Sequence, residues 1–324
     1  MSNTPFFSVI VPVYNKEPHI KRSFNSVLSQ AFQDFELIVV CDPSSDDSDV
    51  EVAKFKDSRI RVFQRDKAGA GGYAARNLGV KKAKSNWLVF LDADDEWMPK
   101  HLENLSILID KFKKDSIFSS GWRVVEGGAS LVDKFSLTNL NKPFLRMNLK
   151  EYLLYEIQGA RPIWTSVACI KKDLLVNAGL FPEGKISMGG DVDTWIRCVN
   201  LAEGCVWSNH IGAIYHRDSI NMVTKNSVIS PELHLLTAAA LLNKNKSRAL
   251  SNLIKVRTNN LVITAWNNNM RIKCVKNFKL LGKLFFVVQP VKVFVYILFS
   301  ILPFYIQRHA HRIGDIFISR LRRY

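Results

Sequence analysis

The chain has 324 residues, of which 47% are hydrophobic and 23% charged, with 16 glycines and 11 prolines. This balance is typical of a globular protein with one large or two ordinary domains, and it excludes wholesale disorder, collagen-like repeats and coiled coil. The five cysteines contain no C-x-x-C pair, which disfavours a disulfide framework or a thiolate zinc site and favours a reducing compartment. The first residues show no basic leader and no small-residue cleavage site, so we predict no secretory export.

The net charge of +16 is concentrated at one end of the chain. Residues 241–324 hold 16 Lys and Arg against a single acid, whereas residues 1–240 hold 29 basic and 28 acidic residues. The two parts therefore have different electrostatic roles. We predict a nearly neutral domain over residues 1–225, with halves 1–99 and 100–225, and a basic, apolar helical extension over residues 226–324.

Strand-like and helix-like segments alternate over the first hundred residues. Buried strands are predicted at 8–14, 35–40, 60–63 and 87–91, with helices at 16–30, 50–56 and 73–84. Strands this apolar, separated by helices, predict an α/β fold with a Rossmann-like, mostly parallel sheet covered on both faces. Residues 100–225 mix helices, at 100–113, 150–158, after 171 and after 191, with antiparallel strands near 117–125 and 164–170.

Acidic side chains follow the strand predicted at residues 87–91. Asp92, Asp94 and Asp95 lie within four positions, so their charges repel one another unless a cation lies among them. Carboxylate oxygens suit Mg²⁺ or Mn²⁺, which proteins usually share with substrate phosphates. Tyr14 and Asp42 end two other strands and are expected at the same edge of the sheet, where such folds bind ligands. A solvated acidic turn is the alternative.

A glycine-rich turn precedes the helix predicted at 73–84. Residues 69–74 match G-x-G-x-x-A, a pattern of dinucleotide-binding folds. The turn follows the third strand rather than the first, and three acids lie downstream where a ribose contact needs one, so a dehydrogenase is disfavoured. The pattern G-x-x-x-x-G-K-[ST] of phosphate loops is missing from the sequence. The glycines can still admit an anionic ligand at the helix N-terminus, or let the backbone pass close to a neighbour.

A further carboxylate begins the helix predicted after the Gly-Gly pair at 189–190. The apolar positions of this helix place Asp191 at its N-terminal end, exposed to ligand. An ordinary N-cap is the alternative for Asp191. For Asp193, an ion pair with Arg197 is the favoured interpretation, because the two residues are four positions apart on a helix.

Seven motifs in this order resemble family 2 glycosyltransferases, which are inverting enzymes of the GT-A fold. The resemblance covers residues 6–222, and its motifs are SVIVPVYN at 8–15, SVLSQ at 26–30, DFELIVV at 34–40, AARNLG at 74–79, FLDADD at 90–95, GLFPE at 179–183 and DVDTWIR at 191–197. It implies a nucleotide-sugar donor, expected to be a UDP-sugar, together with Mn²⁺ or Mg²⁺. The acceptor would be a hydroxyl of a growing surface glycan such as lipopolysaccharide or capsule.

The resemblance also implies roles for single residues. Asp191 would be the catalytic base, and Asp42 would contact the nucleobase. Pro12, Val13 and Tyr14 would contact the nucleoside of the donor. The D-x-D pair Asp92 and Asp94 would bind the ribose and the metal. The metal ligands would be Asp94, Asp95 and His216. His216 or Arg217 would contact the diphosphate, and a structural strand end is the alternative for this segment.

Two positions depart from the family pattern, Pro43 where glycine is usual and Gly190 where glutamate is usual. They keep a non-catalytic sugar-nucleotide-binding or assembly protein as an alternative. A sugar nucleotidyltransferase is a second alternative, distinguished by release of pyrophosphate.

The predicted chemistry agrees with these roles. A sugar that leaves a diphosphate needs its departing charge neutralised, which a metal held by Asp94 supplies. An acceptor hydroxyl is a poor nucleophile until a positioned carboxylate takes its proton, which suits Asp191. Displacement from the opposite face inverts the anomeric carbon.

The basic extension combines positive charge with apolar surface. Residues 271–283 place four lysines on one helical arc, and the apolar run 284–306 is interrupted by polar residues and prolines, so a clean spanning helix is not expected. We predict peripheral association with the anionic inner face of the cytoplasmic membrane, on the cytoplasmic side. The alternative is a helical subdomain that packs on the first domain or forms a homo-oligomer contact. Nucleic acid is not expected as a partner.

Overall fold

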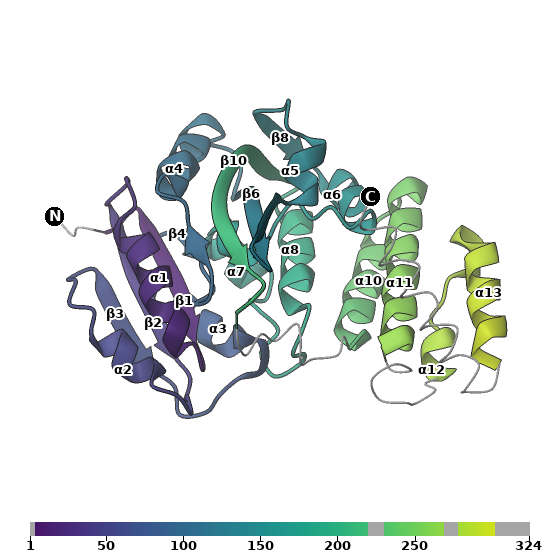
Figure 1. Ribbon diagram of the computed structural model, residues 1–324. Coiled ribbons are helices and arrows are strands. Elements are labelled where there is room, and N and C mark those ends of the chain that lie inside the picture. Colours follow the sequence, from purple (N-terminus) through teal and green to yellow (C-terminus); the bar gives the residue numbers. More distant parts are fainter. Residues whose placement is uncertain (1–3, 220–229, 269–277, 302–324) are drawn as a thin grey trace. The chain divides into compact units, whose positions relative to one another are not determined.

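A computed structural model describes residues 4–219, 230–268 and 278–301 of the chain (Figure 1). The chain divides into two compact units, residues 1–227 and 228–324. The first unit is built on one ten-stranded mixed sheet with helices, and the described part of the second unit is helical.

The first half of the sheet is parallel, as predicted. Its strands are β1 (Phe7–Val13), β2 (Phe35–Cys41), β3 (Ile60–Gln64) and β4 (Trp87–Phe90), in the order β3-β2-β1-β4. The helices between them are α1 (Glu17–Leu28), α2 (Ser48–Ala53) and α3 (Tyr73–Lys82). Because β2 has a neighbour on each side and its seven residues are all buried, its sequence is almost continuously apolar.

Alternation along β1 puts helices on both faces of the sheet. Val9 and Val11 belong to the core that contains Ile20 of α1. Ile10 points the other way, toward α3, where a Cβ added to Gly79 would lie 2.5 Å from its Cγ2. The lack of a side chain at Gly79 therefore lets α3 lie close against the sheet.

The second half of the unit adds the antiparallel pairs expected from the sequence. The sheet continues through β9 (Cys169–Lys171), β6 (Ile117–Glu126), β10 (Cys205–His216) and β5 (Glu96–Trp97); β9 is antiparallel to β4 and β6, and β10 is parallel to β6. Two strands, β7 (Ala129–Val132) and β8 (Phe144–Met147), pair off this path. The helices are α4 (His101–Lys111), α5 (Lys134–Thr138), α6 (Leu149–Ile157), α7 (Lys172–Asn177) and α8 (Gly190–Leu201).

The strand predicted at 164–170 is wrong over most of its length. Thr165–Val167 form a 3₁₀ turn, and β9 begins only at Cys169. Ser166 forms hydrogen bonds with residues that follow β4 rather than with a neighbouring strand. Its hydroxyl accepts from Asp92 N–H at 3.2 Å, and its carbonyl accepts from Trp97 Nε1 at 2.6 Å. The turn therefore packs against the acidic loop.

The second unit contains α10 (Glu232–Lys244), α11 (Arg248–Asn268), α12 (Phe278–Leu281) and α13 (Pro290–Ile301) in its described part. Val262, Ala265 and Leu280 form a small core there. Most of the helix predicted at 271–283 and the end of the apolar run 284–306 lie outside the described residues. In the described stretches of the chain, no helix has both the length and the apolar character needed to cross a bilayer.

Candidate active site

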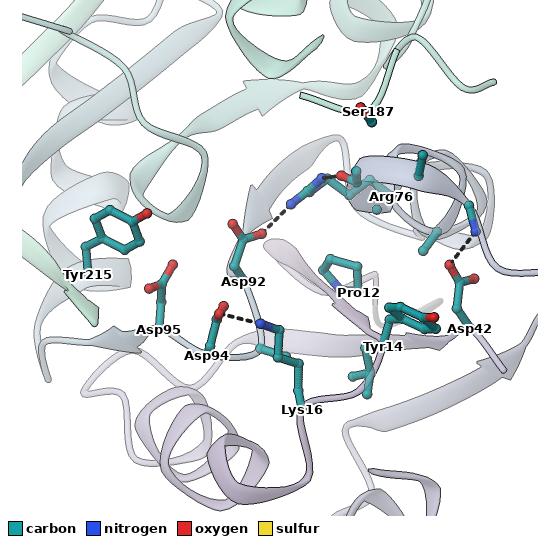
Figure 2. A pocket seen from close by; sticks show the side chains of 17 residues that line it. Pro12, Tyr14, Lys16, Asp42, Arg76, Asp92, Asp94, Asp95, Ser187 and Tyr215 are labelled. Atoms are coloured by element: carbon teal, nitrogen blue, oxygen red, sulfur yellow. Dashed lines mark hydrogen bonds and ion pairs between the residues drawn. The ribbon is translucent and has the colours of Figure 1, made fainter. Parts of the chain in front are cut away.

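A cavity of about 320 Å³ lies beyond the carboxyl ends of β1, β2 and β4 (Figure 2). The side chains that the sequence assigned to donor binding line this cavity together with the third acid of the loop: Pro12, Val13, Tyr14, Asp42, Asp92, Asp94 and Asp95. The strands that carry these residues are neighbours in a parallel sheet, so their loops open on the same edge. The predicted convergence of three separate segments on one crevice is confirmed.

The cavity also has lining residues for which the sequence predicts no role, among them Lys16, Arg76, Ser187 and Tyr215. The glycine turn at 69–72, predicted to admit an anionic ligand or a close backbone approach, lines it as well. Arg76 follows the glycine turn by one helical turn, which is the signal that could have found it. Ser187 has no such signal, since it lies more than 90 residues from the acidic loop.

Asp42 is held by two groups from the segment after β3. The Arg65 guanidinium forms an ion pair with Oδ1, and Gly69 N–H donates to Oδ2 at 2.9 Å. The carboxylate is buried, so these contacts replace the water it loses. The end of β2 is thereby joined to the glycine turn in one fixed arrangement.

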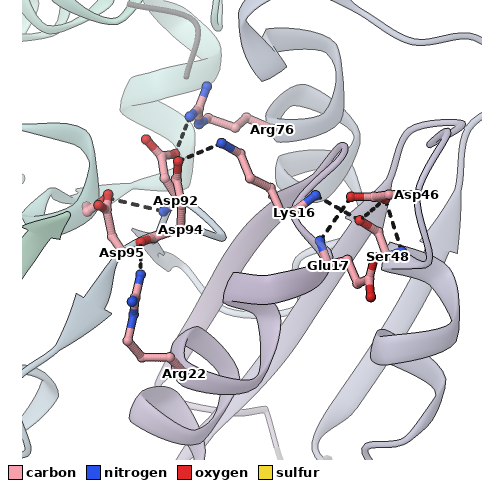
Figure 3. A network of polar contacts seen from close by, with 10 residues as sticks. Lys16, Glu17, Arg22, Asp46, Ser48, Arg76, Asp92, Asp94 and Asp95 are labelled. Atoms are coloured by element: carbon pink, nitrogen blue, oxygen red, sulfur yellow. Dashed lines mark hydrogen bonds and ion pairs between the residues drawn. The ribbon is translucent and has the colours of Figure 1, made fainter. Parts of the chain in front are cut away.

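The next two carboxylates each have a basic partner from this chain. Arg76 of α3 forms an ion pair with Asp92, and Lys16 Nζ lies 2.6 Å from Asp94 Oδ2 (Figure 3). The Asp94 carbonyl also accepts from Arg22 at 2.6 Å. Both basic side chains that reach the carboxylates also line the cavity, so they place positive charge beside the acidic loop.

Lys16 is positioned by the loop that precedes α2. Its backbone N–H donates to Ser48 Oγ at 2.8 Å, and Glu17 N–H donates to Asp46 Oδ2 at 3.1 Å (Figure 3). Ser48 Oγ in turn donates to Asp46 Oδ1 at 2.5 Å. This loop satisfies N–H groups at the start of α1 and holds the Lys16 backbone beside the acidic loop.

Asp95 has a different environment from its two neighbours. Asp95 is 1% exposed, and Oδ2 accepts from Ser166 Oγ at 2.7 Å, while Oδ1 is buried and has no hydrogen-bond partner among the residues that the structure describes. Burial, and next the negative charges of Asp94 and Asp92, raise the pKa of Asp95 well above its ordinary value. A buried carboxylate oxygen without a partner fits a site that receives a cation.

Asp191 lies in the first turn of α8 and does not cap it. The helix begins at Gly190, and the preceding Gly189 has a φ of 84° and offers no side chain, so the N-cap interpretation of Asp191 is wrong. Thr165 Oγ1 lies 3.4 Å from Asp191 Oδ2. Asp191 is not among the residues that line the cavity, although Ser187, four positions earlier, is.

Asp193 has the structural role favoured by the sequence. Its carboxylate is fully buried and lies 2.8 Å from Arg197 Nε, one helical turn further on. The guanidinium also donates to the backbone carbonyls of Ala178 and Leu180. The predicted ion pair is confirmed, and it ties α8 to the turn after α7.

The structure does not assemble the predicted metal set. His216 Nε2 lies 3.1 Å from Glu96 Oε2, and Arg217 pairs with Glu126 at 3.0 Å. Within the ranges described, no three His, Cys, Asp or Glu side chains are arranged to hold a metal ion, so Asp94, Asp95 and His216 do not form such a cluster. Within the segment 215–217, Tyr215 is the residue that lines the cavity, and His216 and Arg217 are not among its lining residues.

The mixed sheet, with paired carboxylates and a glycine turn at its strand ends, defines an α/β protein with a site suited to a nucleotide. Residues 8–167 match the family described as glycosyl transferase family 2. Over this region the chain belongs to that family, and the fold matches GT-A glycosyltransferases, as the sequence predicted.

Two relatives show the range of similarity. The chain is 38% identical over 130 residues to a UDP-Glc:α-D-GlcNAc-diphosphoundecaprenol β-1,3-glucosyltransferase from Escherichia coli, covering 40% of this chain and 49% of that one. It is 28% identical over 244 residues to a GalNAc(5)-diNAcBac-PP-undecaprenol β-1,3-glucosyltransferase from Campylobacter jejuni, covering 74% of each. The chain spans between about a third and about half the length of the first curated relatives it matches.

A solved structure has the same fold. TarS 1-349 of S. aureus in complex with UDP-GlcNAc superimposes with a TM-score of 0.69 and 21% identity, covering 88% of this chain and 83% of that one. At this identity the likeness shows the fold alone.

Proposed function

We propose that this protein transfers a sugar from a UDP-sugar to a hydroxyl of a lipid-linked surface glycan, with inversion at the anomeric carbon. The observation that carries the proposal is the cavity in which Asp42, the glycine turn and the acidic loop meet. Each of these groups would bind one part of a nucleotide-sugar. Asp42 would bind the nucleobase, the glycine turn the diphosphate, and the acidic loop the ribose and the cation. The relatives with printed UDP-Glc and undecaprenol-linked substrates support the donor and acceptor classes.

The nucleoside would bind at the β1 and β2 ends of the cavity. Asp42 has both oxygens oriented by Arg65 and Gly69, and each oxygen keeps a lone pair that can accept an N–H of the base. Tyr14 is 48% exposed and can pack a ring face against the base. Asp92, held by Arg76, would accept a ribose hydroxyl.

Asp94 and Asp95 would hold Mn²⁺ or Mg²⁺ together with oxygens of the diphosphate. Two carboxylates suit these ions, and the unpartnered Oδ1 of Asp95 fits the group. When bound, the ion supplies Lewis acidity to the leaving nucleoside diphosphate. Lys16 and Arg76 place two further positive charges at the same part of the cavity.

Asp191 would act as the base that takes the acceptor proton. It is partly exposed in the first turn of α8, where the positive end of the helix dipole favours a negatively charged group. Asp193 is excluded from this role, because it is fully buried against Arg197. Attack of the deprotonating hydroxyl from the face opposite the diphosphate gives inversion.

The second unit would bind an anionic membrane surface where a lipid-linked acceptor resides. One side of α13 exposes Val291, Phe294, Leu298 and Ile301, which recur at spacings of three and four residues. Residues 241–301 carry 11 Lys and Arg and no acid. If two copies of the chain paired through this side of α13, the positive charges of residues 241–301 would meet no acidic partner in that segment of the other copy. Anionic lipid headgroups would complement the same charges.

The test of the transfer proposal is Asp191→Asn, with Asp173→Asn as its matched control. Asp173 is also an acid in the first turn of a helix of this unit, α7, and it is exposed. We expect Asp191→Asn to lower turnover of a UDP-sugar by about 10²- to 10⁴-fold with donor Kd and melting temperature nearly unchanged, because the amide cannot take a proton. The control should keep full turnover.

Product analysis separates the alternatives. With Mn²⁺ and a panel of UDP-, GDP- and dTDP-sugars, the proposal requires release of a nucleoside diphosphate. Pyrophosphate as the product would identify a nucleotidyltransferase. Donor-induced thermal stabilisation without any turnover would identify a non-catalytic binding protein, and near-wild-type turnover of Asp191→Asn would remove Asp191 from the mechanism.

A further inference from the structure

Tyr73, the first residue of α3, reaches across the unit to the start of α8. Its phenol oxygen accepts a 2.8 Å hydrogen bond from Gly190 N–H, and the side chain is 3% exposed. The Asp191 N–H is directed at the same oxygen. Burial, followed by the negative charge of Asp191, raises the pKa of Tyr73 above its ordinary value, so the phenol keeps its proton.

Two glycines make room for this side chain. A Cβ added to Gly190 would lie 2.8 Å from Tyr73 Cζ and 2.5 Å from Pro182 Cγ, and one added to Gly71 would lie 2.5 Å from Tyr73 Cε2. These separations are below van der Waals contact, so a larger residue would have to displace the ring together with Pro182 at position 190, or together with the Ser187 carbonyl, 2.7 Å away, at position 71. Gly190, which departs from the family pattern, is thus explained by the close approach of Pro182 and Tyr73.

The ring is held from the side as well. It stacks on Phe181 with centroids 6.3 Å apart and planes at 9°. Asn77, one helical turn after Tyr73, accepts from Phe181 N–H and donates to its carbonyl, both at 3.0 Å. The tyrosine hydroxyl therefore has little freedom to leave the start of α8.

The start of α8 has no cap of its own. Gly189 stands at the N-cap position and makes no side-chain contact to the N–H groups of the first turn, which are normally satisfied by a Ser, Thr, Asp or Asn side chain. Tyr73 supplies that acceptor from a different helix. Gly189, which has a φ of 84°, and Gly190 are the two residues just before Asp191, and glycine is the residue with the greatest backbone freedom.

We propose that Tyr73 is a positioning residue for Asp191: its hydroxyl caps α8 and fixes the backbone that carries the carboxylate. This inference rests on the proposed function, in which Asp191 is the base. It links the nucleotide side of the cavity to the base, because Tyr73 follows directly on the glycine turn that lines the cavity. A base displaced by about 1 Å loses much of its effect on rate.

The test is Tyr73→Phe in the full-length protein, which removes one oxygen and keeps the ring. Hydrogen–deuterium exchange of the backbone amides at 190 and 191 should speed up at least tenfold, with the rest of the sheet unchanged. The kcat for hydrolysis of the UDP-sugar that the wild type turns over fastest should fall by about 10- to 100-fold, while donor Kd stays within about twofold. Tyr296→Phe, which removes a tyrosine hydroxyl that accepts from Asn267 at 3.4 Å in the second unit, should change neither quantity.

A double-mutant cycle with Asp191→Asn identifies the route of the effect. If Tyr73 acts through Asp191, adding Tyr73→Phe to Asp191→Asn should lower kcat by less than about twofold further. Full additivity would overturn the positioning role, and unchanged amide exchange in Tyr73→Phe would overturn the cap itself. Near-wild-type kcat in Asp191→Asn alone would instead contradict the proposed base, and the exchange result would still report on the cap.

Discussion

Two carboxylates of α8, only two positions apart, have different environments. Asp193 is fully buried against Arg197, whereas Asp191 is partly exposed and lies 3.4 Å from Thr165 Oγ1. Side chains two positions apart on a helix point to different sides, so one carboxylate faces the core and the other does not. This difference gives Asp193 a structural role and is consistent with the chemical role proposed for Asp191.

Asp193→Asn should therefore destabilise the fold, in contrast to Asp191→Asn. Removing the negative charge leaves the Arg197 guanidinium in a mostly buried position without its ionic partner, which costs about 3 kcal/mol of unfolding free energy. Urea unfolding at pH 7 measures this loss. A change below about 1 kcal/mol would show that the carbonyl contacts of Arg197 are sufficient without Asp193.

Asp94→Ala tests the cation site in the acidic loop. We expect it to abolish turnover and the extra thermal stabilisation that Mn²⁺ gives with a UDP-sugar, while the apo protein stays folded, since one of three neighbouring negative charges is removed. Asp110→Ala, which removes an exposed acid of α4, is the control and should behave as wild type. Full turnover of the wild type in excess EDTA would contradict a metal at this site.

Among the strands, β2 shows how a charged residue joins several elements inside an apolar sheet. Glu36 is 5% exposed, and its carboxylate accepts from Ser8 Oγ of β1 at 2.6 Å, from Lys84 N–H at 2.6 Å and from Arg61 of β3. Burial alone would raise the pKa of Glu36, but these three contacts outweigh it and lower the pKa below its ordinary value of 4.5. The charged form is thus favoured by the folded state.

Glu36 should make the stability of the first unit depend on pH. Because the folded pKa is the lower one, its contribution is fully present above the unfolded pKa and is lost as pH falls through the folded pKa. We expect Glu36→Gln to lose about 1–2 kcal/mol at pH 7, and the difference from wild type to shrink below about pH 4.5. A difference that is constant from pH 7 to pH 3 in urea unfolding would contradict this assignment.

For the whole molecule, the two units are expected to divide the work between donor chemistry and membrane binding. The cavity residues all lie in the first unit, whereas the exposed apolar side of α13 and most of the positive charge lie in the second. A defect in membrane binding should therefore leave donor binding intact.

The double variant Val291→Glu and Phe294→Glu should weaken binding to phosphatidylglycerol vesicles at least tenfold. Each change replaces apolar area that would enter the interface, worth about 1.5–3 kcal/mol, with a negative charge. Ile107→Glu, at an exposed apolar position of α4, is the matched control. Donor Kd should be unchanged in both, and equal vesicle binding by both variants would contradict α13 as the membrane-binding element.

Local pattern determined the elements of the parallel half of the first unit and the loops where the cavity forms. Apolar runs of strand length and residues at helical spacing are properties of neighbouring positions, so the parallel strands and the placing of Tyr14, Asp42 and Asp92 at one edge followed without coordinates. The ion pair of Asp193 with Arg197 followed likewise, because its partners are one helical turn apart.

Long-range packing decided the remainder. The 3₁₀ turn at 165–167 exists because Ser166 binds the acidic loop some 70 residues earlier, and the pairing of Lys16 with Asp94 joins residues 78 positions apart. The contact of Tyr73 with Gly190 spans 117 positions. Periodicity carries no information about such pairs, because each depends on where two separate elements come to lie. The family resemblance implies a metal ligand at His216, whereas in the folded chain its imidazole pairs with Glu96.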